Sequence, residues 1–151
     1  MQLDFRILAG KPYAAYLRKH LPRVVPHLPW KLNNVSIALV GDKTMADLHV
    51  RFMDIAEPTD VLTFELDHDA RGRCVAGEVI VCVPEARCAA QRNGTRVEQE
   101  LLLYCLHGLL HLTGHDDLDD ASYRRMHRAE DRILTRIGVG AVFAVNRPIR
   151  K

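Results

Sequence analysis

The sequence predicts one domain that combines short β-strands with helices and is organised around a buried helix. Its 151 residues suffice for a domain that buries about two-thirds of its unfolded surface. Segments with alternating apolar residues, typical of strands, are interspersed with segments that have helical periodicity. Residues 101–112 are apolar nearly all round apart from two histidines, which is typical of a helix inside a domain. We therefore expect a single domain over residues 1–151.

The composition excludes several classes of protein. The four cysteines show neither a CxxC pair nor zinc-ribbon spacing, so we expect free, buried thiols. The first residues lack a basic stretch followed by an apolar one, and no apolar run is long enough to span a bilayer. We expect a cytoplasmic protein with no membrane partner. The formal charge of +2 is too small to indicate nucleic acid by itself.

The first half of the chain predicts two strands and two helices. Residues 2–8 alternate in the manner of a strand, and residues 11–28 have helical spacing that three prolines interrupt. Residues 35–40 are again typical of a strand. Asp42 is a suitable N-cap for a short helix after it.

The second half begins with a loop over residues 54–58, followed by strands over residues 59–65 and 74–83. Pro84, a favoured first helical residue, predicts a short helix. Thr95 and Glu98 have the spacing of a capping box and predict the start of the central helix. A last helix is expected over about residues 119–137, because it starts on acids and ends before a glycine.

The central helix carries the clearest candidate site. His107 and His111 are four residues apart, so both imidazoles project from one face, within reach of one metal ion. Gly114 can adopt the positive φ that ends a helix and turns the chain back, which makes Asp117 the natural third ligand. A lone histidine on an apolar helix face is typically a core residue, but this combination favours a metal site.

The spacing His-x-x-x-His-x-x-Gly-x-x-Asp copies the metal motif of the metzincin peptidases, whose three ligands leave an open position on the zinc. Those peptidases carry a general-base Glu directly after the first His, and Gly108 occupies that place here. The pattern therefore predicts the metal frame without its peptidase base. A zinc peptidase or amidase stays open as an alternative if another carboxylate folds into the site.

Three motifs make the chain resemble the YbeY-type endoribonucleases of bacterial ribosomal RNA maturation. Residues 58–64 are similar to that family's Pro-Thr-Asp-Val-Leu-Ser-Phe, residues 77–81 to its Gly-Asp-Ile-x-Ile, and residues 107–117 to its His-Gly-x-Leu-His-Leu-x-Gly-Tyr-Asp-His. The resemblance implies an α+β fold with a small mixed β-sheet packed with helices and a zinc-type site on the long buried helix. It also implies hydrolysis of single-stranded RNA.

The resemblance implies that the substrate is a ribosomal RNA precursor, which is processed at the 3′ end of the small-subunit RNA. It also implies that the protein has a further role in ribosome quality control. The ribosome or small-subunit proteins are the implied partners, and no DNA is expected. A non-catalytic RNA- or ribosome-binding factor with a structural metal is the second alternative, although an open metal position counts against it.

The chain departs from the family at several functional positions. The family's third ligand is a His where this chain has Asp117, and its Tyr is replaced by His115. A carboxylate oxygen reaches a metal at about the same distance as an imidazole, but it makes the ligand set harder and more anionic, which puts the implied Zn²⁺ in question. The family's Arg before Pro-Thr-Asp is Met53 here, and Arg51 is either its substitute or a solvent-facing charge.

His115 and Asp116 are the candidates for proton transfer in metal-assisted hydrolysis of a phosphodiester, because they flank the ligand set. We expect His115 not to be a ligand, since the turn at Gly114 carries it off the helical path.

The last helix gathers five arginines on one face. They predict either a track for RNA phosphates or a solvated face balanced by Glu130 and Asp131. The five are Arg124, Arg125, Arg128, Arg132 and Arg136. Arg147, Arg150 and Lys151 could extend the same positive surface.

Overall fold

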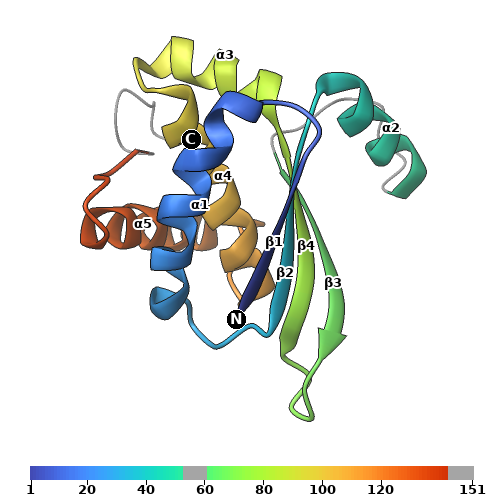
Figure 1. The fold of residues 1–151 in the computed structure, drawn as a ribbon. Coiled ribbons are helices and arrows are strands. Elements are labelled where there is room, and N and C mark those ends of the chain that lie inside the picture. The colour runs from blue at the N-terminus through green and yellow to red at the C-terminus, as the bar shows by residue number, and fades with distance from the viewer. Residues whose placement is uncertain (53–60, 143–151) are drawn as a thin grey trace.

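The structure is a computed structural model that describes residues 1–52 and 61–142 (Figure 1). The strands are β1 (Gln2–Ile7), β2 (Asn34–Val40), β3 (Val61–His68) and β4 (Cys74–Cys82). The α-helices are α1 (Ala14–Val24), α2 (Asp42–Phe52), α3 (Val83–Asn93), α4 (Val97–Leu112) and α5 (Asp120–Arg136), and the 3-10 turns η1 (Lys11–Tyr13) and η2 (Val25–His27) flank α1. These elements confirm the predicted α+β class.

The four strands form one mixed sheet in the order β1-β2-β4-β3. β1 is parallel to β2 and β2 is parallel to β4, whereas β3 runs antiparallel to β4. The central strands β2 and β4 are buried over most of their length, while β1 alternates exposed and half-buried residues as an edge strand does. The small mixed sheet is therefore confirmed.

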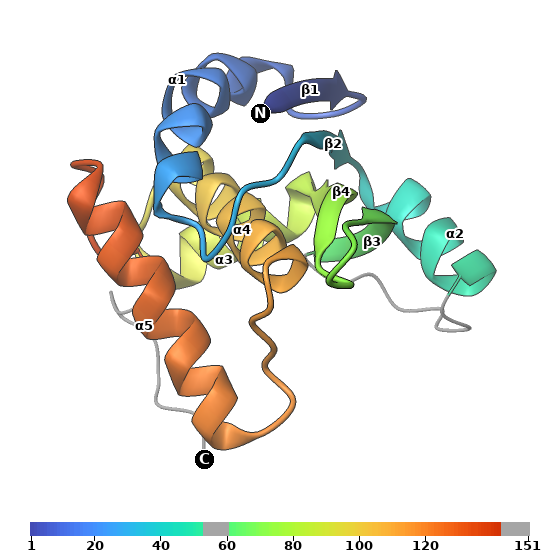
Figure 2. The ribbon, with the colours of Figure 1, turned by 90° about the horizontal axis from the view of Figure 1, so that it is seen from below.

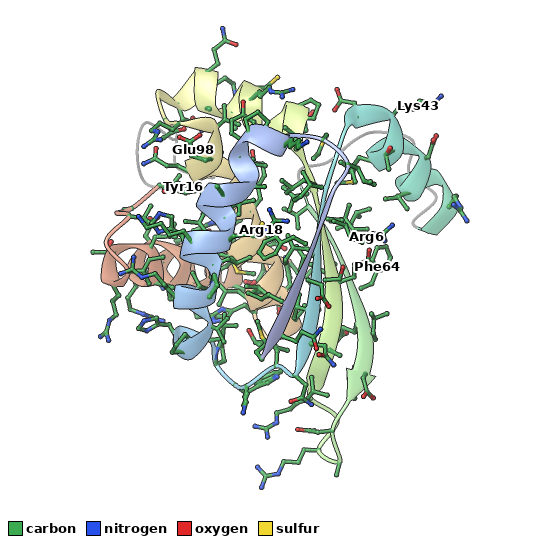
Figure 3. The ribbon with its side chains drawn as sticks, viewed as in Figure 1. Arg6, Tyr16, Arg18, Lys43, Phe64 and Glu98 are labelled. Atoms are coloured by element: carbon green, nitrogen blue, oxygen red, sulfur yellow. The ribbon has the colours of Figure 1, made fainter. Side chains whose placement is uncertain are left out.

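The two faces of the sheet have different partners. Ile37 and Leu39 of β2 belong to the large core that includes residues of α1, α3, α4 and α5, whereas Ala38 and Val40 join a smaller core with α2. This division follows from the alternation of side chains along a strand. Figure 3 shows Phe64 of β3 on the side of α2. The helix with the two histidines and α2 thus lie on opposite faces.

Helix α4 is the buried helix that the sequence predicts, and two glycines set its distance from the sheet. It packs against α1, α3, α5, β3 and β4. A Cβ on Gly108 would lie 2.5 Å from Val79 Cγ1, and a Cβ on Gly77 would lie 2.8 Å from the side chain of Leu112. Because neither position has room for a side chain, helix and strand approach closely along the whole of the last two turns of α4.

The start of α4 differs from the predicted capping box. Arg96 is the N-cap, and its backbone N–H donates to the side chain of Gln99 at 3.0 Å. The hydroxyl of Thr95 instead donates to the buried carboxylate of Glu100 at 3.1 Å. The capping pair therefore forms one residue further along the chain, between Arg96 and Gln99. Thr95 is not available for it, because its hydroxyl donates to Glu100.

The helix predicted over residues 11–28 is divided into three parts. α1 covers only Ala14–Val24, with Pro22 inside it, and a 3-10 turn precedes and follows it. Each of the two 3-10 turns carries a proline in its first positions. A proline lacks an N–H and fixes its φ, so it fits the first turn of a short helix better than the interior of a long one.

The expectations from composition hold in part. All four cysteines are free thiols, but Cys88 is exposed on α3, whereas the other three are buried as predicted. Within residues 1–52 and 61–142, no helix has the length and apolar character that crossing a bilayer requires.

Candidate metal centre

Helix α4 presents His107 and His111 on one face, one turn apart, as their spacing requires. Their Nε2 atoms lie 3.0 Å apart, and the two rings meet edge to face with centroids 4.6 Å apart. The side chain of His107 is 17% exposed and that of His111 is 27% exposed. The two ring nitrogens therefore converge at a point that solvent can reach.

Gly114 ends α4 and returns the chain to the histidines. Its φ is +100°, in the region that favours glycine, and the N–H of His115 donates back to the last turn of α4 at 2.9 Å. The turn places Asp117 Oδ2 3.5 Å from His107 Nε2, and Asp117 Oδ1 3.7 Å from His111 Nε2. The predicted trio of side chains is brought together.

The three side chains fit one divalent ion. A tetrahedral site with bonds of about 2.0–2.1 Å needs ligand atoms about 3.3 Å apart. Here the two imidazole nitrogens are 3.0 Å apart, and each lies 3.5 or 3.7 Å from a different carboxylate oxygen of Asp117. Among the described residues, His107, His111 and Asp117 form one of two groups whose possible ligand atoms all lie within 4.8 Å of one another. Three ligands leave a fourth position for water or a substrate oxygen.

A buried carboxylate from α5 supports His107 on the side away from the other ligands. Glu130 is 0% exposed, its Oε2 lies 2.6 Å from His107 Nδ1, and its Oε1 contacts Nδ1 of His127. Since Nδ1 of His107 donates to this carboxylate, Nε2 is the nitrogen that faces His111 and Asp117. The expectation that Glu130 balances the arginines at the surface is wrong, because its side chain points between α4 and α5.

Without a metal, this cluster holds a proton on His107. Burial lowers the pKa of His107, but hydrogen bonds with Asp117 and Glu130 outweigh it and raise that pKa to about 10. The hydrogen bond with His107 lowers the pKa of Asp117 to about 2. Burial, and then the charge of His107, lower the pKa of His111. A divalent ion would therefore replace one proton next to two carboxylates.

His115 and Asp116 line a cavity next to the metal centre. This cavity, of about 320 Å³, also involves Trp30 and Arg125. Burial, and then the charge of Arg132, lower the pKa of His115. His115 belongs to neither group of candidate metal ligands in the part of the chain that the structure describes. Its role and that of Asp116 in proton transfer stay predictions.

Arg51 lies on α2 and is exposed. Helix α2 packs on the face of the sheet opposite to α4, at the far side of the sheet from α5 (Figure 1). The structure therefore does not place the helix of Arg51 beside His107 and His111, and its proposed role stays a prediction. Met53, Thr59 and Asp60 lie outside the described residues.

The sheet leaves no room for a side chain at position 108, where a peptidase carries its general base. Gly108 follows His107, and a Cβ there would meet Val79 of β4 at 2.5 Å and Thr63 of β3 at 3.2 Å. A carboxylate at this position would collide with the apolar side-chain atoms of the sheet. Packing thus explains why the motif carries glycine, and it argues against the peptidase alternative.

Gly108→Ala should lower the free energy of unfolding by about 1–3 kcal/mol, because the added methyl group overpacks the contact between α4 and the sheet. Urea unfolding of the metal-free protein measures the change. Gly41→Ala is the matched control, since a Cβ on Gly41 meets nothing within 4 Å. Equal stabilities of the two variants would contradict the close approach at Gly108.

The fold and the site together define an α+β protein with a cluster of three candidate metal ligands at the end of its buried helix. The model of one protein family, described as Endoribonuclease YbeY, matches residues 8–138. The chain belongs to the YbeY family, which confirms the resemblance seen in the sequence motifs.

Curated relatives named Endoribonuclease YbeY support this assignment. The protein from Thermobifida fusca is 38% identical over 110 residues, which cover 68% of this chain and 71% of the relative. The protein from Frankia alni is 38% identical over 113 residues, which cover 68% of this chain but only 62% of the relative. The solution structure of TM1509 from Thermotoga maritima matches with a TM-score of 0.58 and 24% identity, over 89% of this chain and 91% of that one. This last likeness concerns the fold alone.

Proposed function

We propose that this protein is a metal-dependent endoribonuclease that cleaves single-stranded RNA during ribosomal RNA processing. The observation that carries the proposal is the cluster of His107, His111 and Asp117, which would leave one position of a four-coordinate ion open, in a chain whose relatives are named endoribonucleases. The substrate is the precursor of the small-subunit RNA near its 3′ end, and the same activity serves ribosome quality control. The proposal includes the ribosome or its small-subunit proteins as partners, in the cytoplasm.

Zn²⁺ is the proposed ion. Zinc binds imidazole nitrogen and carboxylate oxygen in four-coordinate sites, and catalytic zinc sites keep three protein ligands. When bound, the ion polarises a phosphate oxygen and lowers the pKa of its water towards neutrality. Asp117 makes the set harder than three imidazoles would, so Mn²⁺ is the second ion to test.

The side chains around the ligands have separate tasks in this proposal. Glu130 fixes the orientation and tautomer of His107 through its 2.6 Å hydrogen bond. His115 or Asp116 takes up the proton that the attacking water loses, because both residues follow the glycine turn and come directly before the third ligand. Arg51 is proposed to contact the RNA away from the metal ligands, because α2 lies on the other face of the sheet.

The RNA backbone is proposed to follow the arginine face of α5. All five arginines of this face are exposed: Arg124, Arg125, Arg128, Arg132 and Arg136. The opposite face of the helix packs into the core through residues such as Met126 and Ile133. Arginine pairs with phosphate in a bidentate manner and needs no particular base, which suits contact with the RNA backbone.

Changing Arg128 and Arg132 together to glutamine should weaken binding to unrelated single-stranded RNAs to a similar extent. Two lost phosphate contacts should also reduce the slope of log K against log salt by about 1.4. Fluorescence anisotropy of labelled RNA over a salt series measures both effects. Changing the exposed Arg87 and Arg92 of α3 to glutamine is the control with the same charge change. Equal slopes in the two double variants would leave the arginines of α5 as ordinary surface charges.

Cleavage assays with and without a chelator test the proposed activity. The purified protein should cleave single-stranded RNA, lose this activity on chelation and regain it with Zn²⁺ or Mn²⁺, while leaving a matched duplex and casein intact. Turnover of casein would favour the peptidase alternative. Tight RNA binding without cleavage in any metal would favour the non-catalytic factor.

A further inference from the structure

A cavity beside the turn at Gly114 is lined by residues other than the three candidate metal ligands, and it has the composition of a second binding site. It lies between the segment before β2, the connection from α4 to α5 and the first turns of α5. The backbones of these three segments can be followed in Figure 2. The walls of the cavity include Trp30, Gly114, His115, Asp116, Ser122 and Arg125. Its volume of about 320 Å³ is at the lower end of the ~300–1,000 Å³ of small-ligand pockets. We propose that this cavity binds one nucleobase of a single-stranded RNA whose backbone passes the metal centre.

Trp30 supplies a rigid aromatic wall. Its indole Nε1–H donates to the backbone carbonyl of Cys74 in β4 at 2.8 Å. Its six-membered ring packs on Gly114, where a Cβ would lie 3.0 Å from two ring carbons. The guanidinium of Arg73 lies 5.6 Å from the ring centroid. Because three contacts fix the indole, a base that stacks on it would lose little additional side-chain freedom from the protein.

The other walls carry groups that recognise the edge of a base. Asp116 is an exposed carboxylate that can accept from base N–H groups, and Arg125 is an exposed guanidinium that can donate to base carbonyl and ring nitrogen acceptors. The hydroxyls of Thr113 and Ser122 already donate to backbone carbonyls, so they line the cavity without offering a donor. An aromatic face with one acceptor and one donor group is the set that single-stranded RNA recognition uses.

The position of the cavity connects it to the proposed path of the RNA. Asp116, in its wall, directly precedes the ligand Asp117, and consecutive Cα atoms are about 3.8 Å apart. Arg125, which also lines the cavity, belongs to the arginine face of α5. A strand that follows that face towards the metal would therefore bring a base to the cavity. This inference rests on the proposed function for the identity of the ligand as RNA.

A free phosphate or a sugar phosphate fits the cavity less well than a base. Such a ligand would pair with Arg125 but would leave the indole of Trp30 without a stacking partner, and the carboxylate of Asp116 would repel it. The indole of Trp30 therefore favours a base over a free phosphate or a sugar phosphate.

The chain contains one tryptophan, so the intrinsic tryptophan fluorescence of the full-length protein reports on this cavity alone. We would titrate metal-free, chelated protein with a short single-stranded RNA and follow both tryptophan fluorescence and the anisotropy of a labelled strand. The two signals should change together, with quenching of the fluorescence. A strand in which abasic residues replace the bases should bind more weakly and leave the fluorescence unchanged, and so should inorganic phosphate.

Two variants test the same wall. Trp30→Ala should weaken RNA binding by about 5- to 150-fold, the effect of losing one stacked base. Trp30→Phe keeps an aromatic face and should restore most of the affinity, which separates stacking from a folding defect. RNA binding without fluorescence quenching, equal quenching by the abasic strand, absence of RNA binding, or equal affinities of both variants and the wild type would each overturn the proposal. Because the titration uses metal-free protein, quenching without any cleavage by metal-loaded protein would sink the proposed activity but keep the base-binding cavity.

Discussion

Replacing His107 or His111 by alanine should abolish retention of the metal and reduce RNA cleavage by more than about 100-fold. Removal of either imidazole leaves two ligands, whereas loss of a supporting residue around a metal site already costs about 10–100-fold in affinity or activity. His111 is the more exposed of the two side chains, so His111→Ala should fold as the wild type does. His107→Ala also removes one partner of the buried Glu130 and should lower folding stability, so urea unfolding of both variants accompanies the metal measurement. Elemental analysis after dialysis measures the retained metal.

His68→Ala is the matched control for this pair, because His68 is an exposed histidine whose imidazole pairs with Glu65 and belongs to neither group of candidate metal ligands among the described residues. It should retain the metal content of the wild type. A stoichiometric metal in the double variant of His107 and His111 would show that the ion binds elsewhere.

Glu130 should have the second-largest effect. Glu130→Gln should lower metal affinity by about 10–100-fold, because the charge that orients His107 is lost while the shape of the side chain is kept. Glu130→Ala should in addition cost about 3–5 kcal/mol of folding stability in metal-free protein, since it removes one partner of a buried charged pair. Metal titration and urea unfolding in the presence of a chelator measure the two effects.

Asp120→Asn provides the comparison for Glu130, because Asp120 is an exposed acid on the same helix. It should change metal affinity little. Wild-type metal affinity in Glu130→Gln would reduce Glu130 to a buried structural acid with no influence on the site.

The clustering of His107, His111 and Asp117 could be predicted because its determinants are local. Helical geometry converts the four-residue spacing of His107 and His111 into two converging imidazoles. Gly114 needs only its own freedom at positive φ to return Asp117 to them. These relations hold within eleven consecutive residues, so no tertiary contact had to be known in advance.

Two further features depend on contacts between distant segments, and periodicity does not reveal such contacts. Position 108 requires glycine because Val79, in a strand far away in the sequence, packs directly against it. Glu130 reaches His107 from the next helix. One signal was present for Glu130: at helical spacing it falls between Met126 and Leu134 on the apolar face of α5, where a carboxylate requires a buried partner.

The third ligand is the feature of the proposed centre that can be tested most directly. Metal content in Asp117→Ala, His115→Ala and Asp117→His identifies this ligand. The structure places Asp117 3.5 and 3.7 Å from the two imidazole nitrogens and His115 in the wall of the neighbouring cavity. We expect Asp117→Ala to lose most of its metal, His115→Ala to retain it, and Asp117→His to retain it through a third imidazole. Loss of metal in His115→Ala with full retention in Asp117→Ala would contradict the proposed centre.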